Sequence, residues 1–196
     1  MKRRIVVALT GASGSIYGVR LLEELQRAEG VETHLIVSSA ACMNLAAELD
    51  AGRERVESLA DVCYSDKDIG AAIASGLFKT DAMIIAPCSM RTLAGVATGL
   101  AGSLITRAAD VILKERRRLL LLTREAPLNL VHLRNMTTVT EMGGIIFPPV
   151  PAFYLGIDSL DAMIDQTVGR MIELIGIDTP LVRRWEGLKT RPTSRS

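Results

Sequence analysis

Small and hydroxyl-bearing residues recur at three points where an apolar run passes into a segment with helical periodicity. They occupy positions 11–14 (Gly-Ala-Ser-Gly), 38–39 (Ser-Ser) and 87–92 (Pro-Cys-Ser-Met-Arg-Thr). Where a strand ends and a helix begins, unpaired backbone N–H groups and the positive end of the helix attract an anion. The sequence therefore predicts that these three loops converge on one anionic ligand.

The spacing of the glycines indicates which anionic ligands the first loop can bind. Gly11 and Gly14 are followed by Gly18, which is not the dinucleotide pattern G-x-G-x-x-G, and the loop lacks the lysine of a Walker motif. The second strand ends in Ser38-Ser39 instead of the acidic residue that binds an adenosine ribose, so a terminal phosphate or a flavin edge fits better than NAD. Two structural alternatives stay open: a tight turn without a ligand at Gly11, and a helix N-cap at Ser38 or Ser39.

Two glutamates are placed to transfer protons near such a ligand. Glu48 lies late in the second expected helix, and Glu125 follows Arg124 just beyond the apolar segment 118–123. Two carboxylates beside an anion site can serve as proton donor and acceptor. The alternatives are a solvated helix face for Glu48 and a loop ion pair for Arg124 and Glu125.

A cysteine nucleophile and a metal site have less support. Cys88 lies in the third loop, but the two histidines, His34 and His132, have no spacing that recommends either as its base. A small buried residue is the favoured interpretation of Cys88. No His/Cys cluster has metal-ligand spacing, so the sequence predicts no metal.

The elements that must position these residues alternate between β-branched apolar runs and amphipathic stretches. Strands are expected at 4–10, 33–38, 81–86, 118–123 and 144–147, and helices at 15–28, 40–49, 69–75, 91–98, 104–115, 128–141 (with Pro127 at its start) and 158–174. This alternation predicts an α/β fold with a doubly wound, mostly parallel, Rossmann-like sheet of the flavoprotein type in a single domain. Ligands are expected at the carboxyl ends of its strands, where the three loops lie.

Composition indicates how the chain is organised and which partners it binds. Of 196 residues, 48% are hydrophobic and 23% charged, which predicts one folded domain over 1–188 followed by a polar, basic and flexible tail at 189–196. A net charge of +1 with three Phe, three Tyr and one Trp argues against a nucleic-acid partner. A mean hydropathy of +0.27 favours a homo-oligomer.

The same composition predicts the compartment. No apolar run approaches the roughly 18 residues of a spanning helix, so no membrane partner is expected. The opening MKRR-IVVAL is interpreted as a buried first strand instead of a secretory signal, because its apolar segment is short and passes directly into the first loop. The odd count of three cysteines, Cys42, Cys63 and Cys88, without an export signal indicates reduced thiols in the cytoplasm.

Longer segments resemble a known family. They are TGASG after the first strand, PCSMRTLAG after the third, RAADVILKERR, TREAPLNLVHLRNM, PPVPAFY and RRWEGL, collinear from Arg4 to Leu188. In this order they resemble the UbiX/Pad-type flavin prenyltransferases. The resemblance implies an enzyme that joins dimethylallyl monophosphate to reduced FMN, at flavin N5 with loss of phosphate and then at C6, without a metal. It also implies a dodecameric homo-oligomer, and a UbiD-like decarboxylase as recipient of the prenylated FMN.

The resemblance implies roles for individual residues as well. Positions that match FMN contacts are Gly11, Ala12, Ser13, Ser38, Ser89, Met90, Arg91, Thr92, Arg107 and Arg124. Positions that match contacts to the prenyl phosphate are Lys114, Arg124, Tyr154 and Arg170, with Trp185 on a C-terminal segment that closes over the prenyl pocket. Ser13, Glu48 and Glu125 match residues implicated in proton transfer, and Glu125 is the expected acid/base.

Two other functions stay open on the same fold. A flavin-dependent cysteine decarboxylase would carry a P-A-S-A-N-T type of motif where this chain has Pro-Cys-Ser-Met-Arg-Thr, and it would use a catalytic histidine. A non-catalytic FMN-binding subunit of a hydroxyarylic-acid decarboxylase would bind the flavin without consuming a prenyl phosphate. It would leave Glu48, Glu125, Lys114 and Arg170 without a common task.

Overall fold

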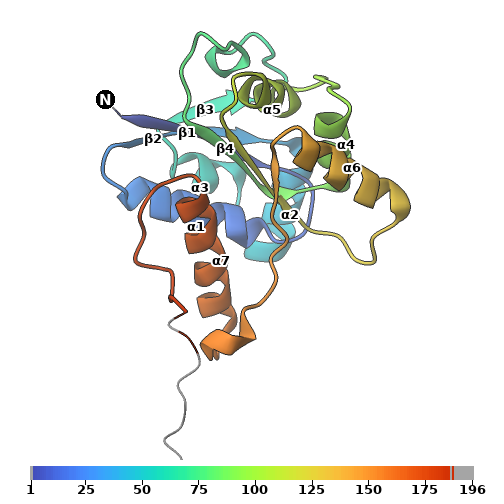
Figure 1. Ribbon diagram of the computed structural model, residues 1–196. Helices are drawn as coiled ribbons and strands as arrows, with labels where there is room; N and C mark the ends of the chain where they lie inside the picture. Colours follow the sequence, from blue (N-terminus) through green and yellow to red (C-terminus); the bar gives the residue numbers. More distant parts are fainter. Residues whose placement is uncertain (1, 186, 188–196) are drawn as a thin grey trace, which may run out of the picture.

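The computed structural model describes residues 2–185 and 187, so the tail expected at 189–196 lies outside the described residues. Six strands form one parallel sheet in the order β3-β2-β1-β4-β5-β6, and helices lie on both faces (Figure 1). The strands are β1 (Arg3–Leu9), β2 (Val31–Val37), β3 (Val62–Ser65), β4 (Ala82–Cys88), β5 (Arg118–Thr123) and β6 (Ile145–Ile146). The helices are α1 (Ser15–Arg27), α2 (Ser39–Leu49), α3 (Arg53–Glu57), α4 (Met90–Ala97), α5 (Leu104–Lys114), α6 (Leu130–Glu141) and α7 (Leu160–Leu174), with short 3-10 turns η1 (Ala72–Ala74) and η2 (Phe153–Leu155). The doubly wound α/β fold expected from the sequence is confirmed.

The order of the strands reverses at β1. This strand pairs with β2 from Arg3↔Val31 to Leu9↔Val37, and with β4 from Ile5↔Ala82 to Ala8↔Ile85. The chain adds β2 and β3 on one side of β1 and then returns to place β4, β5 and β6 on the other. The connections leaving the carboxyl ends of β1 and β4 diverge to opposite faces, which opens the crevice where ligands bind in this fold.

Both faces of the central strands are buried. On β1, Ile5, Val7 and Leu9 contact the core beneath α1, α2, α3 and α7, while Val6 and Ala8 contact the core beneath α4, α5 and α6. None of these five side chains is more than 1% exposed. Burial on both sides explains why the strands read as continuous apolar runs. None of the described helices is long and apolar enough to cross a membrane.

Three local expectations differ from the structure. The strand β3 and the helix α3 were not expected, because β3 is a four-residue edge strand with alternating exposure and α3 has only five residues. Only the 3-10 turn η1 forms where a helix was expected at 69–75. Helix α6 begins at Leu130 instead of near Pro127, because the Asn129 side chain accepts a hydrogen bond from His132 N at 2.9 Å and caps the helix there.

Candidate active site

Three cavities adjoin one another along the carboxyl end of the sheet. The first encloses about 960 Å³ between the loops after β1, β2, β3 and β4 and the start of α5. The second, about 440 Å³, lies between the loop after β1, the start of α4, the end of β5 and Pro148-Pro149. The third, about 240 Å³, lies between 147–157 and α7. Gly11 and Ser89 line both the first and the second cavity, and Pro148 lines both the second and the third, so the three adjoin one another and are together called the groove.

Most of the expected site residues line this groove. The first cavity has Gly11, Ser38, Ser89, Arg91 and Thr92; the second has Gly11, Ala12, Ser13, Ser89, Met90, Arg124 and Glu125; the third has Tyr154 and Arg170. Four expected residues, Glu48, Arg107, Lys114 and Trp185, line none of the three cavities. Tertiary structure thus brings together residues that are more than 150 positions apart in the sequence, such as Gly11 and Arg170.

The N-terminus of α1 is occupied by a carboxylate of the chain itself. Glu48 Oε2 accepts hydrogen bonds from Gly14 N at 2.9 Å and Ser15 N at 2.8 Å. This corrects the expectation that an external anion sits at this helix end: Glu48 is exposed, but its carboxylate is fixed by these hydrogen bonds instead of being free in solvent. Partial burial raises the pKa of Glu48, but the hydrogen bonds from the backbone of Ser15 and Gly14 outweigh burial and hold the pKa below its ordinary value. Glu48 is therefore ionised at neutral pH and can accept a proton but not donate one.

Arg124 is held beside the loop after β1. Its Nη1 donates to Ser13 O at 2.7 Å and lies 3.4 Å from Ser13 Oγ. Gly14 has a φ of 103°, and a Cβ at this position would lie 2.7 Å from Arg124 Nη1, so glycine permits both the turn and the approach. Glu125 is exposed in the second cavity and accepts from Ala126 N at 3.1 Å. Arg124 thus pairs with the Ser13 carbonyl, and the ion pairs of the described residues do not include one between Arg124 and Glu125.

Two serines of the groove also begin helices. Ser38 Oγ accepts from Ala41 N at 3.1 Å and caps α2, and Ser89 Oγ accepts from Thr92 N at 3.3 Å and caps α4. The N-cap alternative is confirmed for Ser38. Both serines nevertheless line the first cavity, so capping fixes their hydroxyls at the ligand-facing ends of the helices.

Sequence reasoning missed Thr10, which joins two loops of the groove. Its side chain is 1% exposed; the hydroxyl donates to Pro87 O at 2.7 Å and accepts from Ser89 N at 2.8 Å. These bonds tie the end of β1 to the turn between β4 and α4 and set the separation of the two loops. A threonine at the end of an apolar strand, directly before Gly11, is the signal that the sequence offered.

The third cavity combines one cation with aromatic side chains. Arg170 is the sole cationic side chain among its described lining residues, and Arg170 Nη1 donates to Glu173 Oε2 at 2.6 Å. The Tyr154 ring contacts the Trp185 ring edge to face, with centroids 5.2 Å apart. A single guanidinium beside apolar walls suits a ligand with one phosphate group and a hydrocarbon chain.

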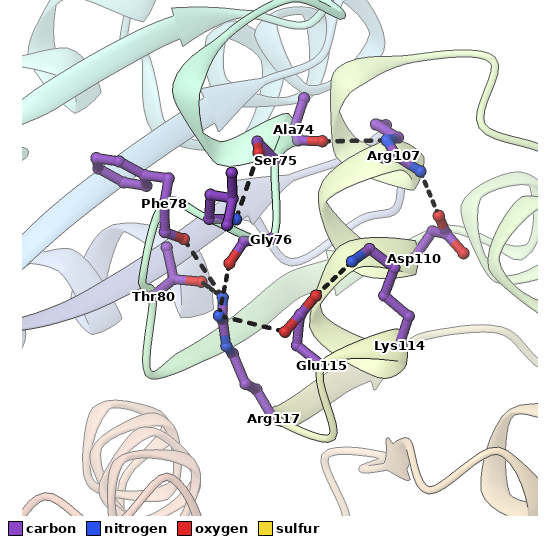
Figure 2. Close-up of polar contacts among 11 residues, drawn as sticks. Ala74, Ser75, Gly76, Phe78, Thr80, Arg107, Asp110, Lys114, Glu115 and Arg117 are labelled. Atoms are coloured by element: carbon purple, nitrogen blue, oxygen red, sulfur yellow. Dashed lines mark hydrogen bonds and ion pairs between the residues drawn. The ribbon is translucent and has the colours of Figure 1, made fainter.

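Arg107 and Lys114 lie on α5, where each is paired with a neighbouring carboxylate instead of lining one of the three cavities. Figure 2 shows Arg107 donating to Ala74 O at 3.2 Å and to Asp110 Oδ2 at 2.6 Å, with Lys114 bonded to the carboxylate of Glu115. The bond from Arg107 to Ala74 O connects α5 to η1, and the other two bonds lie within α5 and its C-cap.

Cys88 is buried, and among the described residues its thiol is not hydrogen-bonded to a basic side chain. Burial raises the pKa of its thiol, so the thiol is protonated at neutral pH. His34 bonds to Tyr64 Oη and Glu32 Oε1 instead. Among the residues that the structure describes, no group of three or more His, Cys, Asp or Glu side chains is placed to hold a metal ion.

The fold and the groove define the class of the protein. A parallel sheet with its ligand crevice at the reversal of strand order, and with hydroxyl-rich loops instead of a dinucleotide motif, is the architecture of a flavin-binding protein. A model of the family described as Flavoprotein matches residues 1–175, and the chain belongs to this family.

Its relatives narrow the family further. The chain is 55% identical over 188 residues to the flavin prenyltransferase UbiX of Neisseria meningitidis serogroup B, which covers 96% of this chain and 99% of the relative. It matches the structure of AnUbiX in complex with FMN and dimethylallyl pyrophosphate with a TM-score of 0.93 and 49% identity, over 96% of this chain and 100% of that one. It matches a dodecameric FMN-dependent UbiX-like decarboxylase of Escherichia coli O157:H7 with a TM-score of 0.92 and 43% identity, over 94% and 100% of the two chains. Within the flavoproteins, the chain belongs to the UbiX-type flavin prenyltransferases, as its motifs predicted.

Proposed function

We propose that the chain joins the dimethylallyl group of dimethylallyl monophosphate to reduced FMN and releases phosphate. We propose further that this reaction takes place in the cytoplasm and that a UbiD-like decarboxylase receives the prenylated FMN. The observation that carries this proposal is the groove of three adjoining cavities, which has hydroxyl-rich helix starts at one end and Arg170 with apolar walls at the other. Reduced FMN supplies two nucleophilic atoms, N5 and C6. The chain's own residues bind and orient the two substrates and move protons.

The first and second cavities fit a flavin nucleotide. A cavity of about 960 Å³ is large enough for a ligand of this size. Thr123 Oγ1, in the wall of the second cavity, is buried and has no hydrogen-bond partner among the described residues, which leaves it available to a polar ligand atom. We assign flavin binding to the loops that carry Gly11, Ala12, Ser13, Ser38, Ser89, Met90, Arg91 and Thr92.

The prenyl phosphate is assigned to the junction of the second and third cavities. Pro148 lines both, so Arg124 in the second and Arg170 in the third lie in adjoining cavities. Arginine binds phosphate in a bidentate manner and stabilises the charge that develops on a departing phosphate. Tyr154 also lines the third cavity, and Trp185 supports the Tyr154 ring.

Glu125 is the acid/base of this proposal. Its carboxylate is exposed to the second cavity, next to Arg124 and across the cavity from Ser13. It can donate a proton to the departing phosphate and accept one when the flavin ring closes. Glu48 holds the loop of Ser13 in place and, being ionised, provides the second acceptor of the relay.

A homo-oligomer would allow Arg107 and Lys114 to contact the ligands of a neighbouring copy. A UbiX-like relative of known structure is dodecameric, and we propose that this chain also forms a homo-oligomer. In such an assembly α5 of one copy can approach the groove of the next, where Lys114 adds charge for the prenyl phosphate and Arg107 contacts the flavin. Release of Lys114 from Glu115 and of Arg107 from Asp110 accompanies that contact.

The test is an anaerobic incubation of the purified protein with reduced FMN and dimethylallyl monophosphate, followed by the mass of the released flavin. A gain of one prenyl unit is expected, and dimethylallyl pyrophosphate in a parallel incubation decides between the two donors. Bound FMN of unchanged mass, with both substrates intact, would refute transfer and support the FMN-binding subunit. Release of carbon dioxide from a cysteine-containing substrate would instead support the cysteine decarboxylase.

A further inference from the structure

One face of α7 contacts residues 181–184 of the last described segment of the chain, 179–185, through a side-chain amide, a glycine and a carboxylate. Gln166, Gly169 and Glu173 are spaced three and four residues apart, so they lie along one side of the helix. Arg170, on the same helix, lines the third cavity. The surface that binds the segment and the residue assigned to the prenyl phosphate are thus neighbours on one rigid element.

Gln166 binds the segment as a neighbouring β-strand would. Its Oε1 accepts from Arg183 N at 2.8 Å and its Nε2 donates to Arg183 O at 3.3 Å, so both backbone groups of one residue are satisfied by one side-chain amide. The Gln166 side chain is 9% exposed. A buried amide with both ends bonded fixes position strongly, because separating the pair would leave polar groups unsatisfied.

Gly169 permits the close approach that these bonds require. A Cβ on Gly169 would lie 2.8 Å from Val182 Cγ2 and 2.9 Å from Leu181 Cβ, closer than real Cβ contacts. Three residues after Val182, Trp185 contacts the Tyr154 ring at the third cavity. The position of Trp185 therefore depends on how closely the segment sits on α7.

Glu173 links the segment to the phosphate-binding arginine. Its Oε1 accepts from Arg184 Nη2 at 2.8 Å, and its Oε2 accepts from Arg170 Nη1 at 2.6 Å. The Glu173 carboxylate therefore touches both the segment and the arginine of the third cavity.

We infer that Gln166 is a positioning residue, which fixes residues 181–185 on α7 and so places Trp185 and Tyr154 at the prenyl-phosphate end of the groove. The inference rests on the proposed function for the identity of the ligand, but attachment of the segment can be measured without catalysis. The chain has one tryptophan, so its fluorescence reports Trp185 alone.

The experiment compares Gln166→Met with Gln26→Met, which makes the same substitution at the other glutamine of the chain, exposed on α1. Acrylamide quenching of Trp185 is expected to rise by up to about twofold in Gln166→Met, because the Trp185 side chain is 52% exposed when attached and fully exposed when released. The KM for dimethylallyl monophosphate is expected to rise about tenfold or more. The reason is that the two Gln166–Arg183 hydrogen bonds, which keep Trp185 beside Tyr154, are lost. The FMN Kd of Gln166→Met should stay at the wild-type value. In Gln26→Met, the quenching of Trp185 and the KM for dimethylallyl monophosphate should both stay at the wild-type values.

A second variant separates attachment from loss of folding. Gly169→Ala improves the helix propensity of α7 and leaves the cavity lining unchanged, yet its methyl group displaces Leu181 and Val182. It should therefore reproduce the higher quenching and the higher KM, while cooperative thermal unfolding shows that the rest of the chain stays folded. Wild-type quenching and KM in both variants would overturn the inference. If the wild-type protein makes no prenylated flavin, the proposed function fails, while the quenching comparison still decides whether Gln166 holds the segment.

Discussion

Replacing Thr10 by valine tests whether the groove depends on one buried hydroxyl. The Thr10 hydroxyl donates to Pro87 O at 2.7 Å and accepts from Ser89 N at 2.8 Å, and Thr10 N also donates to Pro87 O at 3.2 Å. Valine keeps the shape of the side chain, removes both bonds and leaves Ser89 N without its partner. The turn that carries Ser89 should then move away from the loop at Gly11.

The magnitude follows from the two lost bonds and their burial. A hydrogen bond contributes about 1 kcal/mol and an unpaired buried N–H costs about 1–3 kcal/mol, so the free energy of unfolding should fall by about 2–4 kcal/mol. For a chain of this size each kcal/mol corresponds to a Tm change of about 2–4 °C, which gives a loss of roughly 5–15 °C. The FMN Kd should rise about tenfold or more, because Ser89 lines both the first and the second cavity.

Thr33 offers a matched control at the opposite end of the sheet. It is also 1% exposed; its hydroxyl donates to Asp61 Oδ2 at 2.9 Å and accepts from Asp61 N at 3.0 Å, and Thr33 N donates to the same Oδ2 at 2.8 Å. Thr33→Val should lose stability by a similar or smaller amount, since water reaches the exposed Asp61. It should leave the FMN Kd unchanged. Flavin fluorescence titration and thermal unfolding measure the two quantities, and an equal loss of FMN affinity in both variants would refute a specific role for Thr10.

Three further predictions concern the assigned residues. Glu125→Gln should retain FMN binding and lose most turnover, because the amide cannot transfer the proton; turnover equal to wild type in the prenylation assay would remove Glu125 from the mechanism. Arg170→Ala should raise the KM for the prenyl phosphate at least tenfold more than that for FMN, and steady-state kinetics with each substrate varied would show an equal effect if the division of the groove is wrong. The lowered pKa of Glu48 means that its stabilising bonds are fully present above the ordinary glutamate pKa of about 4.3 and are lost as the pH falls through the lower value in the folded chain. Thermal unfolding from pH 7 to pH 3 should accordingly show a smaller acid loss in Glu48→Gln than in wild type, and identical pH profiles would contradict this assignment.

The sequence determined the elements and the chemistry that their ends offer. Strands such as β5 (Arg118–Thr123) were predicted with correct bounds because burial on both faces requires a continuous apolar run, which is visible without any tertiary contact. The three loops were found because glycine and serine at strand-to-helix junctions have local conformational and capping reasons to be there. The family followed from segments of contiguous sequence, which relatives at about 50% identity confirm.

Tertiary structure decided which partners the polar side chains take. Glu48 and Gly14 are 34 residues apart, and nothing in the local pattern around Glu48 predicts that its carboxylate occupies the N-terminus of α1. Thr10 and Ser89, Gln166 and Arg183, and Arg124 and Ser13 likewise meet through the packing of helices on the sheet. Periodicity depends on whether a side chain is apolar, so it reveals which face is buried; a hydrogen bond depends on distance and direction between two particular atoms, and the fold alone sets these.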